Sequence, residues 1–228
     1  MSGSNRSEEI LHLVNTKGSI SIRELAKATY ASPSTIRRDI EKLEQKGLLR
    51  RHHGGAESVL SLNPPQIIRK QRNQAEKKEI SRKAAKLIGP NSTIFIDAST
   101  TVQYMIPYLV GIEGLTVYTN GADTAISLSK LKIRTVCTGG ELFAESMAYV
   151  GQVAVNAVRN IIFDAMFFSG AGFDDSAVTD WSEEESVLRR AVIEQSKKRY
   201  FLADRSKRGR RHTHIVCRVN ELDEIICE

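Results

Sequence analysis

From about residue 80 onward, short apolar runs alternate with amphipathic segments, and this alternation constrains the fold more than any other feature. Strands that alternate with helices at this spacing form a largely parallel sheet covered by helices. We therefore predict an α/β domain over residues 79–228, with ligands bound beyond the carboxyl ends of its strands. The expected strands are Thr93–Ile96, Leu115–Tyr118, Thr135–Cys137, Ala165–Phe168, Tyr200–Ala203 and Ile215–Val219, and the expected helices are Glu79–Ile88, Val102–Leu109, Ala122–Leu131 and Glu183–Gln195.

The excess of basic charge lies before this domain. The 228 residues carry 33 Lys and Arg against 27 Asp and Glu. Residues 1–56 hold 10 basic and 6 acidic side chains, whereas residues 80–228 hold 18 of each. A small basic part joined to a neutral part is typical of a polyanion-binding module carried by a second domain.

Helical periodicity and capping residues predict a helix-turn-helix in the basic part. Ile36, Ile40 and Leu43 are spaced i, i+4 and i+7, so they face inward from one helix. Ser32 precedes this helix as an N-cap, and Pro33 suits its first turn.

The residues before that helix complete the motif. Ala26 is a small residue ten positions before Ile36, where two helices of such a motif cross closely. Tyr30 takes the turn position where Gly is common.

We expect the helix after Ser32 to enter the major groove with its N-terminal residues at the base edges. Arg37 and Arg38 can fork onto guanine or clamp a phosphate, and the sequence does not decide which of them reads a base. A solvated basic helix face is the alternative. The residues of this segment expected to contact DNA are Ser32, Ser34, Thr35, Arg37, Arg38 and Lys42.

A β-hairpin is expected directly after this helix. Residues 47–56 are typical of a strand, a Gly-Gly turn and a returning strand, which together form a wing. Basic residues on a wing reach phosphates or the minor groove, so we expect Arg50, Arg51 and His53 to contact DNA. An ordinary hairpin that closes a small core is the alternative. The predicted winged helix-turn-helix domain spans residues 1–57.

These segments resemble the signature of a known family. Residues 32–39 read SPSTIRRD, residues 47–51 read GLLRR and residues 53–56 read HGGA. A TIRRD recognition helix followed by an HGGA wing is similar to the DeoR family of bacterial regulators. The resemblance implies a sequence-specific transcriptional regulator, with the winged helix joined to a larger Rossmann-like α/β domain that senses a phosphorylated sugar or a similar metabolite. It implies a repressor of sugar or related carbon-metabolism genes, although the sequence equally allows activation.

Later motifs resemble the same family and suggest the effector site. The segment DASTT at residues 97–101 follows a predicted strand and opens a helix, where hydroxyls and backbone N–H groups suit a phosphate or sugar oxygen. Glycines allow a close approach of the backbone to a ligand. Turn chemistry is the alternative for each loop taken alone. The expected effector-binding residues are Asp97, Ser99, Thr100, Thr101, Thr119, Asn120, Gly139, Gly140, Gly170, Gly172, Asp174, Glu184 and Lys207.

The family's effector domain is similar in fold to ribose-5-phosphate isomerase, which raises the question of an enzyme. Isomerisation needs a carboxylate base beside the substrate carbons. The isomerase carries Asp-Gly-Ala-Asp-Glu after the corresponding strand, whereas residues 169–173 read SGAGF here. Both Asp positions are lost, to Ser169 and Gly172, and one of Glu183, Glu184 and Glu185 can match the isomerase's helix carboxylate. We therefore predict a sensor and not an enzyme.

Two stretches depart from the family pattern. Arg205 stands where the family usually has Ser, and the following run to Arg211 is strongly basic. This run indicates either a more anionic effector, such as a bisphosphate, or a solvated loop. Residues 177–181 also differ from the family's usual turn, so the identity of the ligand does not transfer from relatives.

Two other functions are alternatives. One is an active sugar-phosphate isomerase with a basic appendage, and the other is a non-specific architectural DNA binder. The partners expected for a regulator are a double-stranded DNA operator, the metabolite, and further copies of the chain in a dimer or tetramer, because one winged helix contacts only a few base pairs.

No cofactor and no metal are expected, because Cys137, Cys217 and Cys227 lack metal-ligand spacing. The sequence has no long apolar run and no apolar segment of a secretory signal near its start, so we expect no membrane association and a cytoplasmic protein. Residues 58–78, which include Pro64-Pro65, are expected to form a linker.

Overall fold

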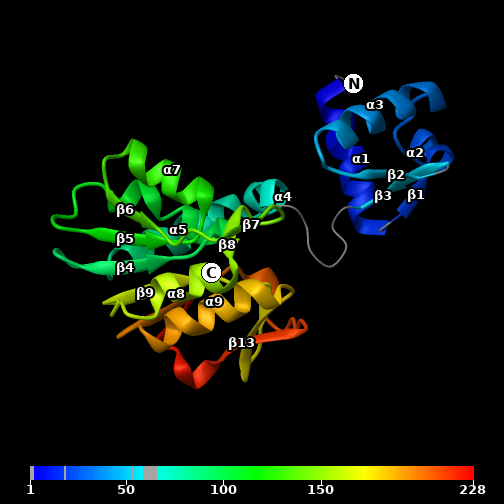
Figure 1. Cartoon of the computed structure of the whole chain (residues 1–228). Helices are drawn as coiled ribbons and strands as arrows, with labels where there is room; N and C mark the ends of the chain where they lie inside the picture. The colour runs from blue at the N-terminus through cyan, green and yellow to red at the C-terminus, as the bar shows by residue number, and fades with distance from the viewer. Residues whose placement is uncertain (1–2, 18, 53, 59–65) are drawn as a thin grey trace. The chain divides into compact units, whose positions relative to one another are not determined.

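The computed structural model describes residues 3–17, 19–52, 54–58 and 66–228 of the chain. It divides into two compact units, Met1–Arg69 and Lys70–Glu228 (Figure 1). Within the stretch assigned to a linker, residues 58–78, the structure contains helix α4 (Gln66–Gln71) and the start of helix α5 (Gln74–Ala85). Pro64-Pro65 lies outside the described residues.

The first unit is a winged helix-turn-helix, as the sequence predicts. Its strands form one antiparallel sheet in the order β1-β3-β2, with β2 at an edge. The elements are α1 (Gly3–Lys17), β1 (Ser19–Ser21), α2 (Ile22–Ala28), α3 (Pro33–Gln45), β2 (Arg50–His52) and β3 (Gly55–Glu57).

Local signals explain where α2 and α3 begin. The Thr35 backbone N–H donates to Ser32 Oγ at 3.2 Å, so the predicted N-cap of α3 is confirmed. Ser21 and Glu24 form a reciprocal capping box at the start of α2. Each such cap stabilises a helix by about 1 kcal/mol. The core of the unit is formed by Ile10, Val14, Ile20, Leu25, Ile36, Ile40, Leu43, Leu49 and Ala56.

The second unit is built on a six-stranded sheet in the order β14-β12-β9-β4-β5-β6, in which all neighbouring strands are parallel. The predicted mostly parallel sheet of an α/β domain is confirmed. The six strands are β4 (Thr93–Ile96), β5 (Thr116–Thr119), β6 (Arg134–Cys137), β9 (Ala165–Phe168), β12 (Arg199–Ala203) and β14 (Glu224–Cys227).

Two short antiparallel pieces and several helices complete this unit. Its remaining elements are α6 (Thr100–Gln103), η1 (Ile106–Leu109), α7 (Ala122–Lys130), β7 (Glu141–Phe143), β8 (Ala148–Val150), α8 (Gly151–Val158), β10 (Gly172–Phe173), β11 (Ala177–Asp180), α9 (Glu183–Glu194), η2 (Arg205–Lys207), β13 (His214–Arg218) and η3 (Val219–Glu221). Strands β7 and β8 form a hairpin, and β10, β11 and β13 form a small sheet.

The C-terminal strands differ from the sequence prediction. The apolar run Ile215–Val219 was expected among the alternating strands and helices, but β13 pairs antiparallel with β11 in the small sheet. The edge strand of the main sheet beside β12 is instead β14, which the sequence analysis missed. Strand β14 is only four residues long and begins with Glu224, so its apolar signal is short.

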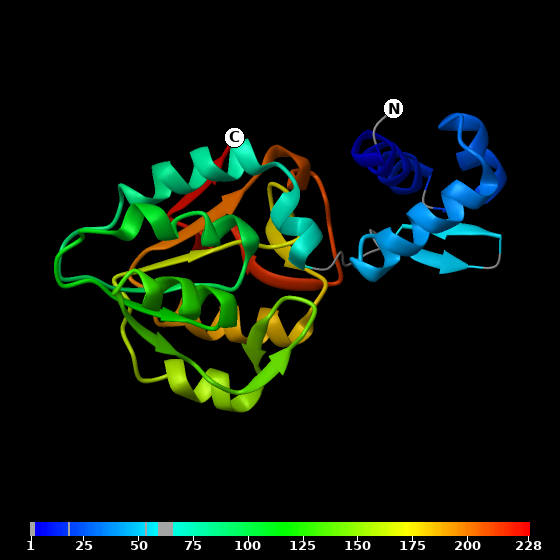
Figure 2. The same ribbon diagram turned by 90° about the horizontal axis from the view of Figure 1, so that it is seen from above.

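The main sheet has an apolar core on each of its faces. On one face, Ile94, Ile96 and Phe167 pack with Ile80 of α5 and Val102 of α6. On the other face, strand residues that include Phe95 and Phe168 pack with α8 and α9. Figure 2 shows the teal helix α5 and the gold helix α9 on opposite sides of the strands. Because both faces are covered, ligand access is expected at the ends of the strands. Within the described ranges, no helix is long and apolar enough to cross a membrane.

Candidate DNA interface and effector site

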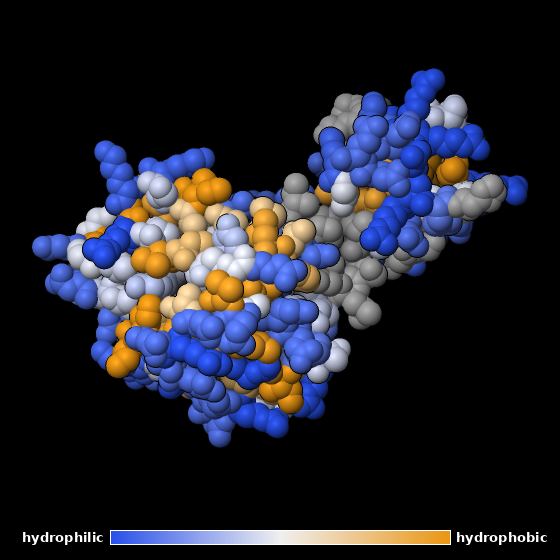
Figure 3. Space-filling model, viewed as in Figure 1, coloured by the Kyte–Doolittle hydropathy of each residue, from blue (hydrophilic) through white to orange (hydrophobic). Residues whose placement is uncertain are grey.

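The sides of α3 away from the core carry basic side chains. Arg37, Arg38 and Lys42 are all exposed. Across the described residues, none of these three cations takes part in an ion pair. Their charges are therefore available to phosphates or to guanine edges. Figure 3 shows that the visible surface of this unit is mostly hydrophilic.

Hydroxyl groups cluster at the start of α3. Ser32 Oγ lies 2.8 Å from both Ser34 Oγ and Thr35 Oγ1. Ser32 and Thr35 also form the helix cap, so their hydroxyls hold the local structure. Ser34 is exposed at the helix end that meets base edges in proteins of this architecture.

Asp39, the acidic residue of the TIRRD segment, points back into the unit. Its Oδ2 accepts from Arg6 Nε of α1 at 2.7 Å, and this hydrogen bond raises the pKa of Arg6. Asp39 is buried, so it joins α1 to α3 and does not face DNA.

The two predicted arginines of the wing have different surroundings. The Arg51 guanidinium pairs with Glu44 of α3 and lies 3.7 Å from Glu41, and the Arg51 backbone N–H donates to Glu44 Oε1 at 2.8 Å. These contacts tie β2 to α3. Arg50 is exposed on the opposite face of β2, because side chains alternate along a strand. His53, also predicted to contact DNA, lies outside the described residues.

In the second unit, the loops after five parallel strands meet at one edge of the main sheet. Most of the predicted effector residues lie there. Asp97, Ser99, Thr100 and Thr101 follow β4, Thr119 and Asn120 lie at the end of β5, Gly139 and Gly140 follow β6, Gly170 follows β9, and Lys207 follows β12.

A buried cluster of one arginine and three carboxylates lies next to the loop after β4. Arg189 of α9 donates from Nε to Asp97 at 3.0 Å, from Nη1 to Asp180 at 2.8 Å and from Nη2 to Glu185 at 3.2 Å. The exposed fraction of all four side chains is 7% or less. Burial disfavours the guanidinium charge, but Asp180, Glu185 and Asp97 raise the pKa of Arg189 overall.

Both oxygens of the Asp97 carboxylate are used in hydrogen bonds within the protein. Besides binding Arg189, the Asp97 carboxylate accepts from the backbone N–H groups of Ser99 at 3.0 Å and Ser169 at 3.3 Å. Its oxygens are therefore used to fix the loops after β4 and β9. Asp97 therefore positions these two loops.

Two lysines reach hydroxyl groups at the same edge of the sheet. Lys77 of α5 is buried, and its Nζ lies 3.1 Å from Thr100 Oγ1. Lys207 Nζ donates to Ser169 Oγ at 2.8 Å, and Ser169 Oγ donates to the Leu202 carbonyl at 2.5 Å. The edge therefore combines cationic nitrogens with hydroxyl oxygens.

Asp204 interacts electrostatically with both of these lysines. Its Oδ1 accepts from Asn73 Nδ2 at 2.9 Å and from the Ser206 hydroxyl. Burial alone would raise the pKa of Asp204, but the Ser206 bond, the charges of Lys207 and Lys77 and the Asn73 bond lower it overall. The buried Asp204 carboxylate thus interacts with the ammonium groups of both Lys77 and Lys207.

Thr119 and Asn120 hold the loop after β5. Thr119 Oγ1 accepts from the Gly121 backbone N–H at 3.0 Å. Asn120 Oδ1 accepts from the Ala98 backbone N–H at 3.1 Å, and Asn120 Nδ2 donates to the Tyr149 carbonyl at 3.3 Å. Thr119 therefore holds its own loop, and Asn120 joins that loop to the loop after β4 and to strand β8.

The remaining hydroxyls after β4 have distinct roles. Ser99 Oγ caps the short helix α6 by accepting from the Val102 backbone N–H. Thr101 Oγ1 is buried and has no hydrogen-bond partner within the described part of the chain. Because α6 is only four residues long, its dipole adds little to anion binding.

Two of the predicted glycines are required by close backbone approaches. Gly140 has φ +114°, and a Cβ there would lie 2.5 Å from the Val150 carbonyl oxygen. A Cβ on Gly172 would collide with the backbone of Arg210. Gly139 has φ +64° and open space around it, and Gly170 is buried against β11.

Asp174 and Glu184 have other surroundings. Asp174 closes the turn between β10 and β11 by accepting from Ser176 and from the Ala177 backbone N–H, and these bonds lower the pKa of Asp174 to about 2. Glu184 is exposed and accepts from Ser182 Oγ at 3.0 Å. Of the three glutamates at the start of α9, Glu185 is the one in the Arg189 cluster.

Two ring nitrogens that the sequence analysis did not single out lie beside the loop after β9. The rings of Trp181 and His212 contact edge to face, with centroids 4.9 Å apart. Trp181 Nε1 and His212 Nε2 are buried and have no hydrogen-bond partner in the described ranges. The His212 backbone N–H donates to Thr179 Oγ1, which itself bonds the Gly172 carbonyl.

The helical pattern could have identified Lys77 and Arg189. Lys77 is spaced i, i+3, i+4 and i+7 from the buried residues Ile80, Ser81 and Ala84. Arg189 follows Glu185 by four positions on the buried face of α9. A cationic side chain on the apolar face of a helix is expected to be buried and paired with a polar or acidic group, because charged side chains are rarely buried alone.

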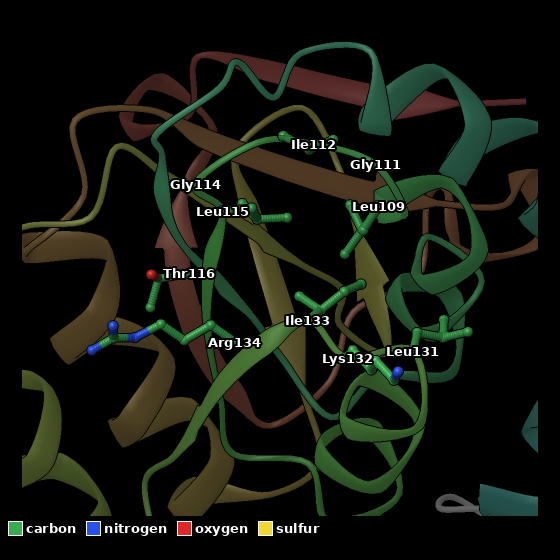
Figure 4. A pocket seen from close by; sticks show the side chains of 10 residues that line it. All are labelled: Leu109, Gly111, Ile112, Gly114, Leu115, Thr116, Leu131, Lys132, Ile133 and Arg134. Carbon is green, nitrogen blue, oxygen red and sulfur yellow. The ribbon is translucent and has the colours of Figure 1, made fainter.

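The cavity shown in Figure 4 lies away from the predicted effector residues. It has a volume of about 380 Å³ and is lined by residues that include Leu109, Leu115, Ile133 and Arg134. Leu115, Ile133 and Arg134 lie at the N-terminal ends of β5 and β6, and Leu109 ends η1, whereas ligands of such sheets bind at the C-terminal ends of the strands. We therefore do not assign the effector to it. Among the described residues, no group of three or more His, Cys, Asp and Glu side chains is arranged to hold a metal ion.

Comparison with known proteins gives matches to both units. Residues 72–228 match the family model of the DeoR C terminal sensor domain, and residues 6–61 match that of the DeoR-like helix-turn-helix domain. The uncharacterized HTH-type transcriptional regulator YulB of Bacillus subtilis is 35% identical over 98% of this chain and 88% of its own length. The lactose phosphotransferase system repressor of Staphylococcus aureus strain N315 is 33% identical over 100% of this chain and 93% of its own length.

Solved structures resemble the fold alone. The delta subunit of eIF2B from Chaetomium thermophilum aligns with a TM-score of 0.50 and 14% identity over 70% of this chain and 58% of that chain. Ribose 5-phosphate isomerase A from Neisseria gonorrhoeae aligns with a TM-score of 0.44 and 16% identity over 58% of this chain and 52% of that chain.

Proposed function

The chain belongs to the DeoR family of transcriptional regulators, and from this premise we propose that it is a repressor of sugar or related carbon-metabolism genes whose affinity for operator DNA changes when it binds a phosphorylated sugar or a similar metabolite. The name of one relative, a lactose phosphotransferase system repressor, supports both the sign of regulation and the class of genes.

The observation that carries the effector proposal is the pair of lysines at the carboxyl edge of the sheet. Lys77 Nζ and Lys207 Nζ each lie within about 3 Å of a hydroxyl oxygen, on Thr100 and Ser169. An ammonium group, a threonine hydroxyl and nearby backbone N–H groups are the donors that bind phosphate in proteins. The phosphate of the effector binds between the loops after β4 and β12.

The sugar part of the effector extends toward the loop after β9. There, Trp181 Nε1 and His212 Nε2 supply a buried hydrogen-bond donor and a second polar nitrogen. A sugar hydroxyl can satisfy such groups, which are costly when left without a partner. Asp97, Thr119 and Asn120 hold the surrounding loops and thereby preorganise the site.

The polar groups at this edge suit binding and not isomerisation. A general base must be an available carboxylate beside the substrate carbons. Asp97 and Glu185 are instead paired with Arg189, and the loop after β9 begins with the hydroxyl of Ser169. The regulators and repressors of the family agree with this assignment.

The DNA site consists of the exposed residues of α3 and the wing. Arg37, Arg38 and Lys42 supply charge, Ser34 and Thr35 supply hydroxyls at the helix start, and Arg50 extends the contact to the wing. A dimer or a tetramer places two such units on paired half-sites. The effector acts by binding more tightly to one arrangement of the oligomer than to another, since equal binding shifts no equilibrium.

Fluorescence anisotropy of the full chain tests this function. The protein is titrated onto duplexes from upstream of its own gene and its neighbouring genes, and onto random duplexes, with and without a panel of sugar phosphates and the corresponding free sugars. We expect tighter binding to an upstream duplex and a change of affinity with one sugar phosphate but not with its free sugar. If the protein binds all duplexes with equal affinity, and no metabolite changes that affinity, the proposal is contradicted and an architectural DNA binder is favoured.

A further inference from the structure

Tyr30 has a backbone conformation that is unfavourable for its residue type. Its φ is +53°, in the left-handed region. For a residue with a Cβ atom, and above all for a bulky one, this region is sterically costly. Its side chain is 94% exposed, the highest exposed fraction among the large hydrophobic residues described.

The turn between α2 and α3 requires this conformation. The Ala31 backbone N–H donates to the Ala26 carbonyl at 3.1 Å, and Thr29 N–H donates to the Leu25 carbonyl at 2.9 Å. This pattern closes the C-terminus of a helix with one left-handed residue, which in most proteins is Gly or Asn. Tyr30 occupies that position, and Ser32 starts α3 two residues later.

Nothing inside the unit compensates for the cost. Within the described residues, Tyr30 makes no hydrogen bond, ring contact or ion pair. Asn73, which also has a positive φ of 51°, offers a contrast because its side chain bonds Asp204. The strained backbone of Tyr30 is not offset by any contact of its side chain within the unit. Such strain is typical of residues that bind a ligand or a partner.

We propose that Tyr30 is a DNA contact, and that its phenolic hydroxyl donates a hydrogen bond to a phosphate of the duplex beside the recognition helix. The first residues of that helix enter the major groove, so the turn that precedes it meets the sugar-phosphate backbone at the rim of the groove. Tyrosine hydroxyls are among the groups that bind DNA phosphates. Such a contact positions the protein on DNA without reading sequence.

Two substitutions at Tyr30 distinguish the effect of the phosphate contact on DNA binding from the effect of the backbone strain on stability. Tyr30→Phe removes only the hydroxyl, whereas Tyr30→Gly removes the ring and also relieves the backbone. The full-length variants are titrated by anisotropy onto a random duplex and an upstream duplex of equal length, at several salt concentrations, and their thermal unfolding is followed. Tyr108→Phe changes a partly exposed tyrosine of the second unit and serves as the matched control.

We expect Tyr30→Phe and Tyr30→Gly to bind both duplexes about tenfold more weakly, because a hydrogen bond to a charged group is lost. The salt dependence stays that of the unchanged protein, because no charge is removed. Tyr30→Gly unfolds at a higher temperature than the unchanged protein, and Tyr108→Phe binds normally. Unchanged binding by Tyr30→Phe, or a loss confined to the upstream duplex, would overturn the proposal.

Discussion

Arg189 Nε and Asp97 Oδ2 lie 3.0 Å apart and join helix α9 to the loop after β4 in the interior of the second unit. The same guanidinium holds Asp180, at the end of β11, and Glu185. One side chain therefore connects the main sheet, the small sheet and a covering helix. The predicted effector loops depend on this connection for their geometry.

Replacing Arg189 with Met should strongly destabilise the second unit. The substitution leaves three buried carboxylates without their cation, and breaking such a buried network by removing one partner costs about 3–5 kcal/mol. Urea unfolding followed by tryptophan fluorescence measures the loss, because Trp181 is the single Trp of the chain. Arg159→Met, at an exposed position, is the control and should unfold as the unchanged protein does. A midpoint for Arg189→Met equal to that of the control would show that the cluster does not stabilise the unit.

The two wing arginines should respond differently to substitution. Arg50→Met removes an exposed charge proposed to meet a phosphate, so it should weaken binding to all duplexes and reduce the slope of log affinity against log salt by about 1. Arg51→Met should change that slope little, because the charge of Arg51 is paired with Glu44 and Glu41. Anisotropy titrations between low and moderate salt compare the two variants. Equal slopes for both would refute the distinction.

Stability should depend on the protonation of His212. Burial lowers the pKa of His212 below its usual 6.5, with Asp180 raising it and Arg210 lowering it further. Because the folded-state pKa lies below the unfolded value, folding favours the neutral ring. The resulting stability is present above about pH 6.5 and is lost as the pH falls through the folded-state pKa.

His212→Asn should therefore reduce the loss of stability between pH 7 and pH 5. Urea midpoints at both pH values measure the effect for the variant and the unchanged protein. The same dependence in His212→Asn as in the unchanged protein would contradict the assignment.

Local patterns in the sequence were sufficient for the winged helix. Ser32 as the cap of α3 and the inward spacing of Ile36 and Ile40 depend on residues within one or two turns of each other. The pairing of Arg51 with Glu44 was not predicted, because it depends on how β2 folds back against α3.

In the second unit, too, local patterns predicted the elements but not the contacts between distant segments. The strand and helix alternation predicted the parallel sheet, but not that β13 would leave it for a small antiparallel sheet. Most predicted effector residues lie together because parallel strands end at one edge. Asn73 and Asp204 are 131 residues apart in sequence, and only the folded chain brings them together.

A phosphorylated metabolite is proposed to act through Lys77 and Lys207 at the carboxyl edge of the main sheet, and substitution of Lys77 tests this proposal. Lys77 is buried with its Nζ on Thr100, whereas its neighbour Lys78 is exposed on the same helix. The measurement is the change in affinity for upstream DNA on adding the panel of sugar phosphates, for Lys77→Met and for Lys78→Met. We predict that Lys77→Met binds DNA normally but loses the metabolite response, and that Lys78→Met keeps both. A full metabolite response in Lys77→Met, with folding confirmed by unfolding curves, would show that the metabolite does not act through this lysine.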